Sequence, residues 1–389
     1  MRVKLKDIFD LQMGKTPSRS NLEYWNTTDY KWISIADLTK TSKYIFETKE
    51  YLSKSAIKDS GIKVIPANTV VMSFKLSIGK TAITKEDMYS NEAIMAFKDK
   101  HVINIIPEYI FYLFKYKNWE ECSNKAVMGK TLNKATLSEI EVEICSIEKQ
   151  RQIVNILDKI MSAVDGRKQE LQLLDELIKA RFVEMFGDPV ANDKGWKMKP
   201  LLDMGKCKNG MNFHYDDSGV EISCLGVGDF KDLSVIDNTK KLSIVSLNEM
   251  PSEEYLLKDG DIVFVRSNGN KDLVGRSLAI YPGKLPTTFS GFCIRYRIHD
   301  DEITVPYLLR VLKMESMRKK MAGRGANIQN LNQQILGTLV IPVPPIELQN
   351  QFVDFVRAIN KSKFDTMTFA PIYAIINLYL HTYFYQGRR

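Results

Sequence analysis

Three Gly-Lys-Thr triplets are the first residues that suggest chemistry, because such a triplet closes a phosphate-binding loop. They begin at Gly14, Gly79 and Gly129. A phosphate-binding loop needs another glycine five residues before the Gly-Lys pair, so that the main chain can surround the phosphate. The residues found there are Phe9, Phe74 and Asn124. The sequence therefore indicates no nucleotide-binding loop at these positions.

Other residue types that commonly catalyse reactions lack the required arrangement. The four histidines are scattered, without the spacing of metal ligands. There is no Gly-x-Ser-x-Gly nucleophile motif and no Asp/Asn-Pro-Pro-Tyr/Phe run of an amino-methyltransferase. Five cysteines without Cys-x-x-Cys spacing disfavour a zinc site and a disulfide framework. These observations predict a chain that is not an enzyme, that holds no metal or cofactor, and whose partner supplies any catalysis.

Basic and polar residues are concentrated in loops that follow apolar strands, where they could contact DNA. Arg and Lys hydrogen-bond guanine or phosphate, and Asn and Gln hydrogen-bond adenine. The candidates in the first half are Lys75, Ser77, Lys80, Lys130, Thr131 and Asn133. Those in the second half are Arg266, Asn268, Lys271, Arg276, Arg324, Asn327, Gln329 and Asn332. Alternatively the loops are solvated turns, and both Asn133 and Asn332 are turn caps, since Asn readily bonds its own backbone.

The composition is that of an ordinary globular protein, with 44% hydrophobic and 26% charged residues. A length of 389 residues suffices for two or three domains. The net charge of +8 permits a nucleic-acid partner without requiring one. The N-terminus has no apolar signal segment, and the most apolar stretch, residues 369–385, is shorter than a typical spanning helix. We therefore expect a cytoplasmic protein without a membrane anchor.

The chain contains one internal repeat. Residues 146–154 match residues 345–353 at an offset of 199, and the same offset pairs Pro107 with Pro306. Further upstream, residues 67–73 align with 260–266, and residues 78–81 align with 274–277. Two copies of about 200 residues are too few and too long for a solenoid. They predict a duplicated unit in which a mixed domain is followed by a helix.

The helix that closes the first copy is the clearest predicted element. Its apolar residues fall on three- and four-residue steps, as in a coiled-coil seam. These residues are Ile153, Leu157, Ile160, Val164, Leu171, Leu174 and Ile178. The helix should end at Gly187, before Pro189. The second closing helix carries Phe352, Val356 and Ile359, and we expect the two seams to pack against each other.

After Asp365 the second copy departs from the first. Residues 369–385 contain no charged residue, and Pro371 is unsuited to a helix interior. The sequence predicts an atypical apolar tail.

The arrangement resembles the specificity subunit of type I restriction–modification enzymes over about residues 1–365. The most specific motifs are residues 181–189 (RFVEMFGDP) and residues 341–349 (IPVPPIELQ). The opening residues 14–18 (GKTPS), followed by Trp25 and Trp32, also look like the start of a target recognition domain. Tyr24, Trp25, Tyr30 and Trp32 could stack on a base, although a place in the core is the other interpretation.

The resemblance implies a division of labour. Two target recognition domains would each read half of a bipartite site in double-stranded DNA, held apart by long antiparallel helices. Modification subunits would bind the helices and carry S-adenosylmethionine, and restriction subunits, where present, would use ATP and Mg. A 40-residue spacer rises about 60 Å, which spans at most about 18 base pairs.

The expected fold class is α+β, with two mixed domains, a coiled-coil pair of long helices and a pseudo-two-fold repeat. The predicted boundaries are 1–146 for the first target recognition domain, 147–187 for the first spacer helix, 188–345 for the second recognition domain and 346–389 for the second helix with its tail. The alternative function is an assembly scaffold with a degenerate C-terminus that no longer reads DNA.

Overall fold

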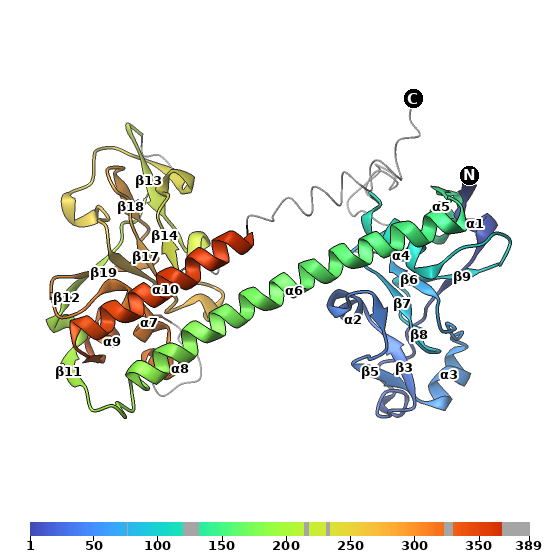
Figure 1. The fold of residues 1–389 in the computed structure, drawn as a ribbon, viewed down its shortest axis with the longest axis horizontal. Helices are drawn as coiled ribbons and strands as arrows, with labels where there is room; N and C mark the ends of the chain where they lie inside the picture. Colours follow the sequence, from blue (N-terminus) through green and yellow to red (C-terminus); the bar gives the residue numbers. More distant parts are fainter. Residues whose placement is uncertain (76, 120–131, 214–217, 231–233, 323–329, 368–389) are drawn as a thin grey trace. The chain divides into compact units, whose positions relative to one another are not determined.

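A computed structural model describes residues 1–75, 77–119, 132–213, 218–230, 234–322 and 330–367. It divides into two compact units, each described by itself (Figure 1). The described residues of unit 1 lie within Met1–Lys168, and those of unit 2 lie within Gln169–Met367. None of the helices in the described residues is both long enough and apolar enough to cross a membrane.

Unit 1 contains three small sheets. The five-stranded sheet has the order β2 (Phe9–Met13), β9 (Ile94–Asp99), β6 (Val70–Ser73), β7 (Thr81–Thr84) and β4 (Tyr44–Ile45). The three-stranded sheet has the order β5 (Glu50–Leu52), β3 (Tyr30–Ile33) and β8 (Tyr89–Ser90), and the third sheet pairs β1 (Arg2–Lys4) with β10 (Glu141–Glu143). The pairs β4–β7 and β3–β8 are parallel, and the other pairs are antiparallel.

The core of unit 1 lies between α4 (Pro107–Tyr116) and the strands β6 and β7. Pro107 stands in the first turn of α4, where a proline loses no hydrogen bond, and all six residues from Tyr109 to Phe114 are buried. The remaining helices of the unit are α1 (Leu5–Ile8), η1 (Leu22–Tyr24), α2 (Ile35–Lys40), α3 (Lys54–Ser60), α5 (Lys134–Glu139) and the start of α6 (Ile147–Phe186).

Unit 2 has the same architecture. Its five-stranded sheet has the order β12 (Gly205–Asn209), β19 (Cys293–Ile298), β16 (Asp261–Val265), β17 (Ser277–Ile280) and β14 (Val235–Ile236). The smaller sheets are β15 (Ser243–Leu247), β13 (Val220–Leu225) and β18 (Thr287–Phe289), and β11 (Lys197–Pro200) with β20 (Val340–Val343). Its helices are α7 (Val305–Lys313), α8 (Glu315–Ala322), α9 (Gln333–Gly337) and α10 (Ile346–Met367), besides the end of α6. Short 3-10 turns are η2 (Leu201–Asp203), η3 (Val227–Phe230), η4 (Thr239–Lys241), η5 (Glu253–Tyr255) and η6 (Lys271–Leu273).

Every sheet of unit 1 therefore has a counterpart in unit 2 with the same strand order. The parallel pairs also correspond, because β14–β17 and β13–β18 are parallel in unit 2. The repeat inferred from matching residues is thus a repeat of the fold of each unit.

The structure corrects the register of the repeat upstream of the helices. Gly79 N–H donates to Ser73 O at 2.9 Å, and Gly275 N–H donates to Val265 O at 2.9 Å. Ser73 therefore corresponds to Val265, and the offset is 265 − 73 = 192. The alignment of residues 67–73 with 260–266 is wrong by one residue. The pairing of Pro107 with Pro306 is also wrong by one residue, because Ile106 N and Thr304 N donate to the equivalent side chains of Gln150 and Gln349, so that Pro107 corresponds to Val305.

The corrected register has a physical basis in the turn before the strand. Asn68 and Gly260 both have left-handed backbone, with φ of 59° and 84°. Glycine adopts this conformation freely and Asn tolerates it, so the turn conserves a conformation rather than a residue type. In this register Phe74, not Ser73, is the counterpart of Arg266.

The first long helix has the predicted bounds to within one residue. Helix α6 runs for 40 residues from Ile147 to Phe186, and Gly187 follows with φ of 74°. The packing of its apolar stripe, however, differs from the prediction. Ile153 and Leu157 belong to the core of unit 1 and are 2% and 0% exposed. Their burial comes from their own mixed domain, so their assignment to a helix–helix seam is corrected.

Of the other residues of the predicted seam, Ile160 and Ile178 pack against the cores of different units. Ile160 packs at the edge of the core of unit 1, and Ile178 lies in the core of unit 2 with Phe352, Val356 and Ile359. Val164 is buried, and Leu171 and Leu174 are half-buried.

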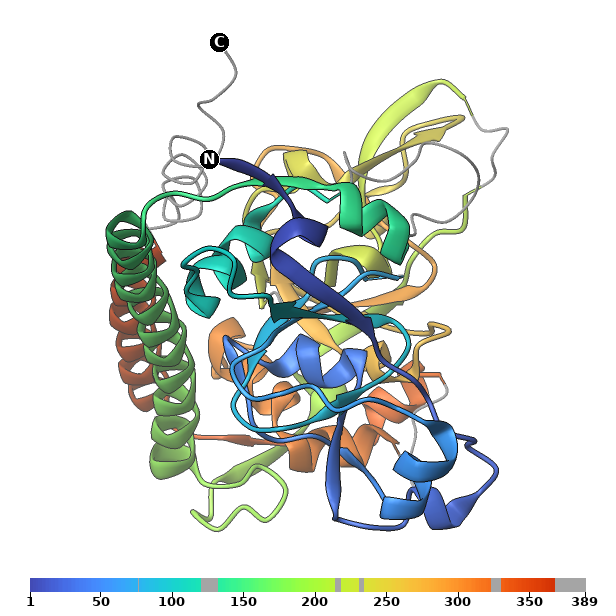
Figure 2. The same cartoon turned by 90° about the vertical axis from the view of Figure 1, so that its right-hand side faces the viewer.

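Helix α10 runs antiparallel to the end of α6 within unit 2. The rings of Phe182 and Phe352 are 5.3 Å apart, and Lys363 Nζ is 2.5 Å from Asp175 Oδ1. Figures 1 and 2 show α10 beside this part of α6. The predicted apolar tail, residues 369–385, lies outside the described residues.

Candidate nucleic-acid interface

In unit 2, three loops meet at one end of the five-stranded sheet: one follows β12, one joins β16 to β17, and one joins β18 to β19. Gly210 N–H donates to Cys293 O at 3.1 Å, and Arg266 N–H donates to Phe292 O at 2.7 Å. Leu331 N–H donates to Arg266 O at 2.8 Å, which adds the chain before α9. We call this group of loops the loop cluster of unit 2.

The same main-chain bonds build the loop cluster of unit 1, from the loops after β2, between β6 and β7, and between β8 and β9. Gly14 N–H donates to Ile94 O at 3.1 Å, and Phe74 N–H donates to Ala93 O at 3.0 Å. Leu132 N–H donates to Phe74 O at 3.2 Å. Both units therefore present three loops at an equivalent edge.

The first Gly-Lys-Thr triplet has a structural role in this cluster. A Cβ atom on Gly14 would lie 2.2 Å from Asn91 O, and one on Gly210 would lie 2.1 Å from Ser290 O. No real Cβ approaches an oxygen so closely, so only glycine allows this strand to meet the neighbouring loop.

In unit 1 the described candidates lie in or beside the loop cluster. Lys75 is half-buried, Ser77 is exposed, and Lys80 Nζ donates to Thr39 Oγ1. Lys130 and Thr131 lie outside the described residues. Asn133 Oδ1 accepts from Thr136 N at 2.8 Å at the start of α5, so its side chain is a helix cap.

In unit 2 some candidates also lie in the loop cluster, some lie outside the described residues, and one caps a helix. Arg266 Nη1 donates to Gly291 O at 3.4 Å, and Arg276 Nε donates to Asp272 O at 3.3 Å. Asn268 is exposed, and its Oδ1 accepts from Asn270 N at 2.8 Å. The side chain of Lys271 is not described, and Arg324, Asn327 and Gln329 lie outside the described residues. Asn332 Oδ1 accepts from Ile335 N at 2.8 Å. The turn-cap alternative is thus correct for both Asn133 and Asn332.

An exposed aromatic residue in this cluster was not among the predicted sites. Phe292 is 60% exposed and lines a cavity of about 430 Å³ with Val227, Ser267, Asn268 and Gly269. Its counterpart in unit 1 is Ala93, because both residues accept the equivalent main-chain bond. No sequence pattern marks Phe292, since one phenylalanine in a loop has the same local signal as a core residue.

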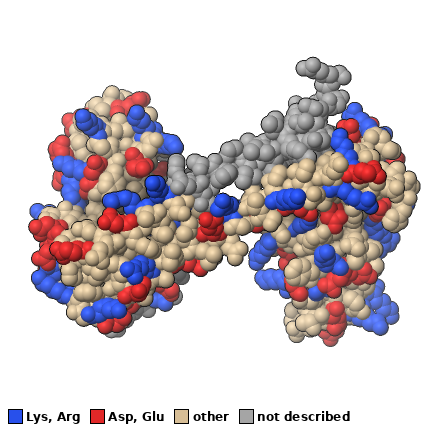
Figure 3. All heavy atoms as spheres, in the orientation of Figure 1, with Lys and Arg blue, Asp and Glu red and all other residues tan. Residues whose placement is uncertain are grey.

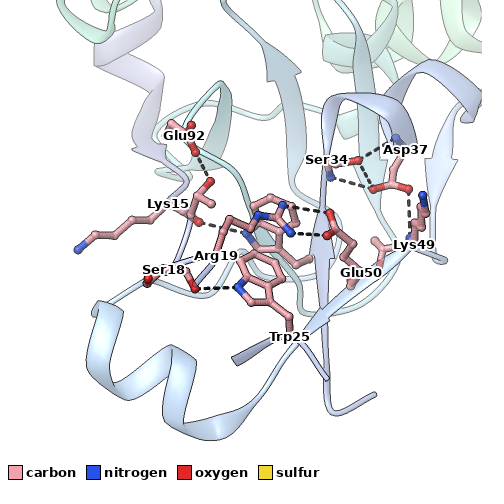
Figure 4. A network of polar contacts seen from close by, with 12 residues as sticks. Lys15, Ser18, Arg19, Trp25, Ser34, Asp37, Lys49, Glu50 and Glu92 are labelled. Atoms are coloured by element: carbon pink, nitrogen blue, oxygen red, sulfur yellow. Dashed lines mark hydrogen bonds and ion pairs between the residues drawn. The ribbon is translucent and has the colours of Figure 1, made fainter. Parts of the chain in front are cut away.

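The tryptophans near the start of unit 1 are structural. Trp32 is buried, and its Nε1 donates to Lys15 O at 3.1 Å. The Arg19 guanidinium covers the face of Trp25 at 3.7 Å and bonds Glu50 (Figure 4). These contacts occupy both indoles, so the base-stacking alternative is replaced by core packing for the two tryptophans.

Hydrogen bonds around these tryptophans also hold the loop after β2 in place. Thr16 Oγ1 donates to Glu92, and this hydrogen bond is the main reason that the pKa of Glu92 is lowered (Figure 4). Trp25 Nε1 donates to Ser18 O at 3.0 Å. The loop after β2 is thereby joined to the loop between β8 and β9.

Charge by itself does not locate an interface. Figure 3 shows basic and acidic side chains interspersed over the visible face of each unit. In the described part of the chain, no group of three His, Cys, Asp or Glu side chains is arranged to hold a metal ion. The feature that distinguishes this end of the five-stranded sheet is that three loops meet there.

Comparison with known proteins points to one family. A family model described as the type I restriction modification DNA specificity domain matches residues 1–176 and 193–371. The MjaIX specificity subunit of Methanocaldococcus jannaschii is 28% identical over 228 residues, which are 54% of this chain and 52% of that protein. The StySPI specificity subunit of Salmonella potsdam is 24% identical over 351 residues, 84% of this chain and 74% of that protein. The chain thus spans about half the length of the first relative and about three quarters of the second.

Solved structures give the same fold. The type I restriction–modification S subunit from M. genitalium aligns with a TM-score of 0.51 and 14% identity over 99% of this chain and 96% of that chain. A chain from a study of complex assembly and conformational transition of the type I R-M system aligns with a TM-score of 0.61 and 14% identity over 97% and 95%. At this identity the likeness concerns the fold alone.

Proposed function

This chain belongs to the family of type I restriction modification DNA specificity domains, and on that basis we propose that it is the DNA-recognition subunit of a type I restriction–modification complex. The observation that carries the proposal is the repeated loop cluster. Each unit joins three loops at the same edge of the same sheet, with basic and polar side chains among them. Two equivalent reading edges suit a target that consists of two half-sites.

In this proposal the chain binds double-stranded DNA and performs no chemistry itself. Lys and Arg side chains of the loops contact phosphates and fix the register, while Asn268 and Phe292 face base edges. A modification subunit supplies S-adenosylmethionine and methylates the site, and a restriction subunit, where present, supplies the ATP- and Mg-dependent activity. The mixed domains 1–146 and 188–345 act as the two target recognition domains, with residues 147–187 and 346–389 as spacers, in the cytoplasm.

The test is co-expression with the cognate modification subunit, followed by mapping of methylated adenines in the host DNA. We expect a new bipartite motif with a fixed gap. If the subunits co-purify but no motif is methylated, the assembly-scaffold alternative replaces DNA reading.

Replacing Phe292 with alanine is expected to relax the motif at one base pair of the half-site read by unit 2. An aromatic side chain contacts the thymine methyl group, and a lost base contact reduces discrimination by about tenfold. The measurement is the methylated fraction at sites that differ from the motif by one base pair. The control is Ile244→Ala, another exposed apolar residue of unit 2, on β15 rather than in the loop cluster. An unrelaxed motif in the Phe292 variant would contradict the assignment.

We also propose that α6 sets the distance between the half-sites. Insertion of seven residues between Asp165 and Gln172, with a matching insertion in the second helix, adds about 10 Å of helix. The gap in the mapped motif should lengthen by about 3 base pairs. A seven-residue insertion between the exposed residues Gly283 and Lys284, in the loop between β17 and β18, is the control and should leave the gap unchanged. A constant gap in the helix variant would exclude α6 as the spacer.

A further inference from the structure

Four basic side chains of unit 2 form a group beside its loop cluster, here called the basic cluster. They are Arg276, Arg310, Lys313 and Arg318. Arg310 and Lys313 are one turn apart on α7, and Arg318 is on α8. Lys313 Nζ donates to Ser234 Oγ at 2.7 Å, and Arg318 Nη2 donates to Val274 O at 3.3 Å. Val274 and Arg276 belong to the loop between β16 and β17, so the basic cluster adjoins the loop cluster.

The positive charges of Arg310, Lys313 and Arg318 are not balanced by ion pairs among the described residues. Asp272 attracts Arg318, and Asp175 attracts Arg310, but Asp175 already forms an ion pair with Lys363 at 2.5 Å. Within the part of unit 2 that the structure describes, Arg310, Lys313 and Arg318 form no ion pair. The Nε atom of Arg310 is buried and has no hydrogen-bond partner in this part of the chain. Buried donors are normally satisfied, so the site lacks an acceptor.

Burial and the neighbouring positive charges lower the pKa of Lys313. Burial, reinforced by the charges of Arg310, Arg276 and Arg318, lowers the pKa of Lys313 to about 8. Burial also lowers the pKa of Arg310 and of Arg318. An anion bound here would restore the full charge of Lys313, because a neighbouring negative charge favours the protonated amine.

The equivalent place in unit 1 has a tyrosine in place of one of the basic side chains. Lys115 corresponds to Lys313, because each lies six residues after a tyrosine that donates to a main-chain carbonyl before the long helix (Tyr109 to Glu143 O, Tyr307 to Pro342 O). Burial lowers the pKa of Lys115, which is attracted by Asp165 on α6 and repelled by Lys168 and Lys43. Tyr112, at the position of Arg310, donates to Asp158, which also pairs with Lys43. Two basic side chains one turn apart on this helix are therefore a feature of unit 2.

We propose that Arg310, Lys313 and Arg318 of the basic cluster bind a backbone phosphate of the DNA next to the half-site read by unit 2. This inference rests on the proposed function. Phosphate supplies several acceptor oxygens to one site, which matches Arg donors on two helices and one ammonium group. Duplex DNA is favoured over an acidic protein surface because Arg276 and the Arg318 acceptor Val274 lie in the loop that carries the base-reading candidates. The contact positions the unit and carries no sequence information.

The test measures DNA binding by the complex with modification subunits, using a duplex that contains the mapped motif. Lys313→Gln is expected to weaken binding at least about tenfold and to reduce the slope of log affinity against log salt by about one, with the motif unchanged. Wild-type affinity should fall as pH rises through 8, because neutral Lys313 must take up a proton. Lys313→Arg should restore affinity and remove this pH dependence.

The matched control is Lys319→Gln. Lys319 is an exposed lysine on α8 that pairs with Glu315 at 2.6 Å, and its loss should change neither the DNA affinity nor the slope of log affinity against log salt. Unchanged affinity and slope in Lys313→Gln, while wild type still binds the motif, would overturn the phosphate site and leave the proposed function intact. Loss of modification-subunit binding instead of DNA binding would also overturn it, in favour of protein docking. If wild type binds no duplex, the proposed function itself fails.

Discussion

Replacing Gln349 with leucine is expected to destabilise unit 2 by about 3 kcal/mol. Gln349 is fully buried at the start of α10. Its Oε1 accepts from Thr304 N at 2.8 Å, and its Nε2 donates to Glu302 O at 2.8 Å and Pro344 O at 2.9 Å. Leucine leaves three main-chain groups without a partner, and each such group costs about 1–3 kcal/mol. This glutamine therefore joins the second spacer helix to the segment that precedes α7.

The first copy of the repeat contains an equivalent glutamine that can be tested in the same way. Gln150 is also fully buried, and its amide makes the equivalent bonds to Ile106 N, Asn104 O and Cys145 O, all at 3.0 Å. Hydrogen exchange is the suitable measurement, because a chain with two units need not unfold in one step. Gln349→Leu should lower the protection of α7 and α10, and Gln150→Leu that of α4. The exposed neighbour Gln351 is the control position, and full protection in both buried variants would contradict this role.

Asp261→Asn is expected to cost unit 2 about 3 kcal/mol. Asp261 is 1% exposed, and both carboxylate oxygens accept from Arg297 at 2.7 Å. The carboxylate also accepts from Lys258 N at 2.7 Å. Removing one partner of a buried ion pair leaves the other charge uncompensated, which costs about 3–5 kcal/mol. The amide retains part of the hydrogen bonding, so the lower end of that range applies.

Unit 1 supplies a matched control for this change. The counterpart of Arg297 is Lys98, and its partner is Asp10, at 3.5 Å with 63% of the acid side chain exposed. Exposed pairs contribute about 0–1 kcal/mol, so Asp10→Asn should have little effect. The measurement is the denaturant dependence of hydrogen exchange in each five-stranded sheet. Equal effects of the two substitutions would show that burial does not set the strength of these pairs.

The helix ends, the repeat and the loops after buried strands could be predicted because they depend on local residue types. Pro107 begins α4, and Gly187 ends α6 with left-handed backbone, as proline and glycine favour at those places. The repeat followed from matching residues. The loops around Arg266 and Lys75 were correctly placed after buried strands, because apolar runs and turn residues are local signals.

Contacts and conformations that the residue pattern does not specify explain the corrections. The stripe on α6 has the same spacing whether it faces another helix or a mixed domain, and the structure places Ile153 and Leu157 in the core of unit 1. The one-residue error in the alignment of residues 67–73 arose because Asn68 and Gly260 share a backbone conformation but not a residue type. For Asn133 and Asn332 the sequence left DNA contact and turn capping open, and in the structure both side chains cap helices.

The sequence by itself determined the duplicated frame, the long helix and the absence of a recognisable catalytic motif, because these depend on residue types and on spacing along the chain. The tertiary structure decided which residues meet. It joined three loops in each unit, required glycine at positions 14 and 210, and brought Arg310, Lys313 and Arg318 together beside one loop cluster. Such groups depend on strand order and helix packing, which bring together residues that are far apart in the chain.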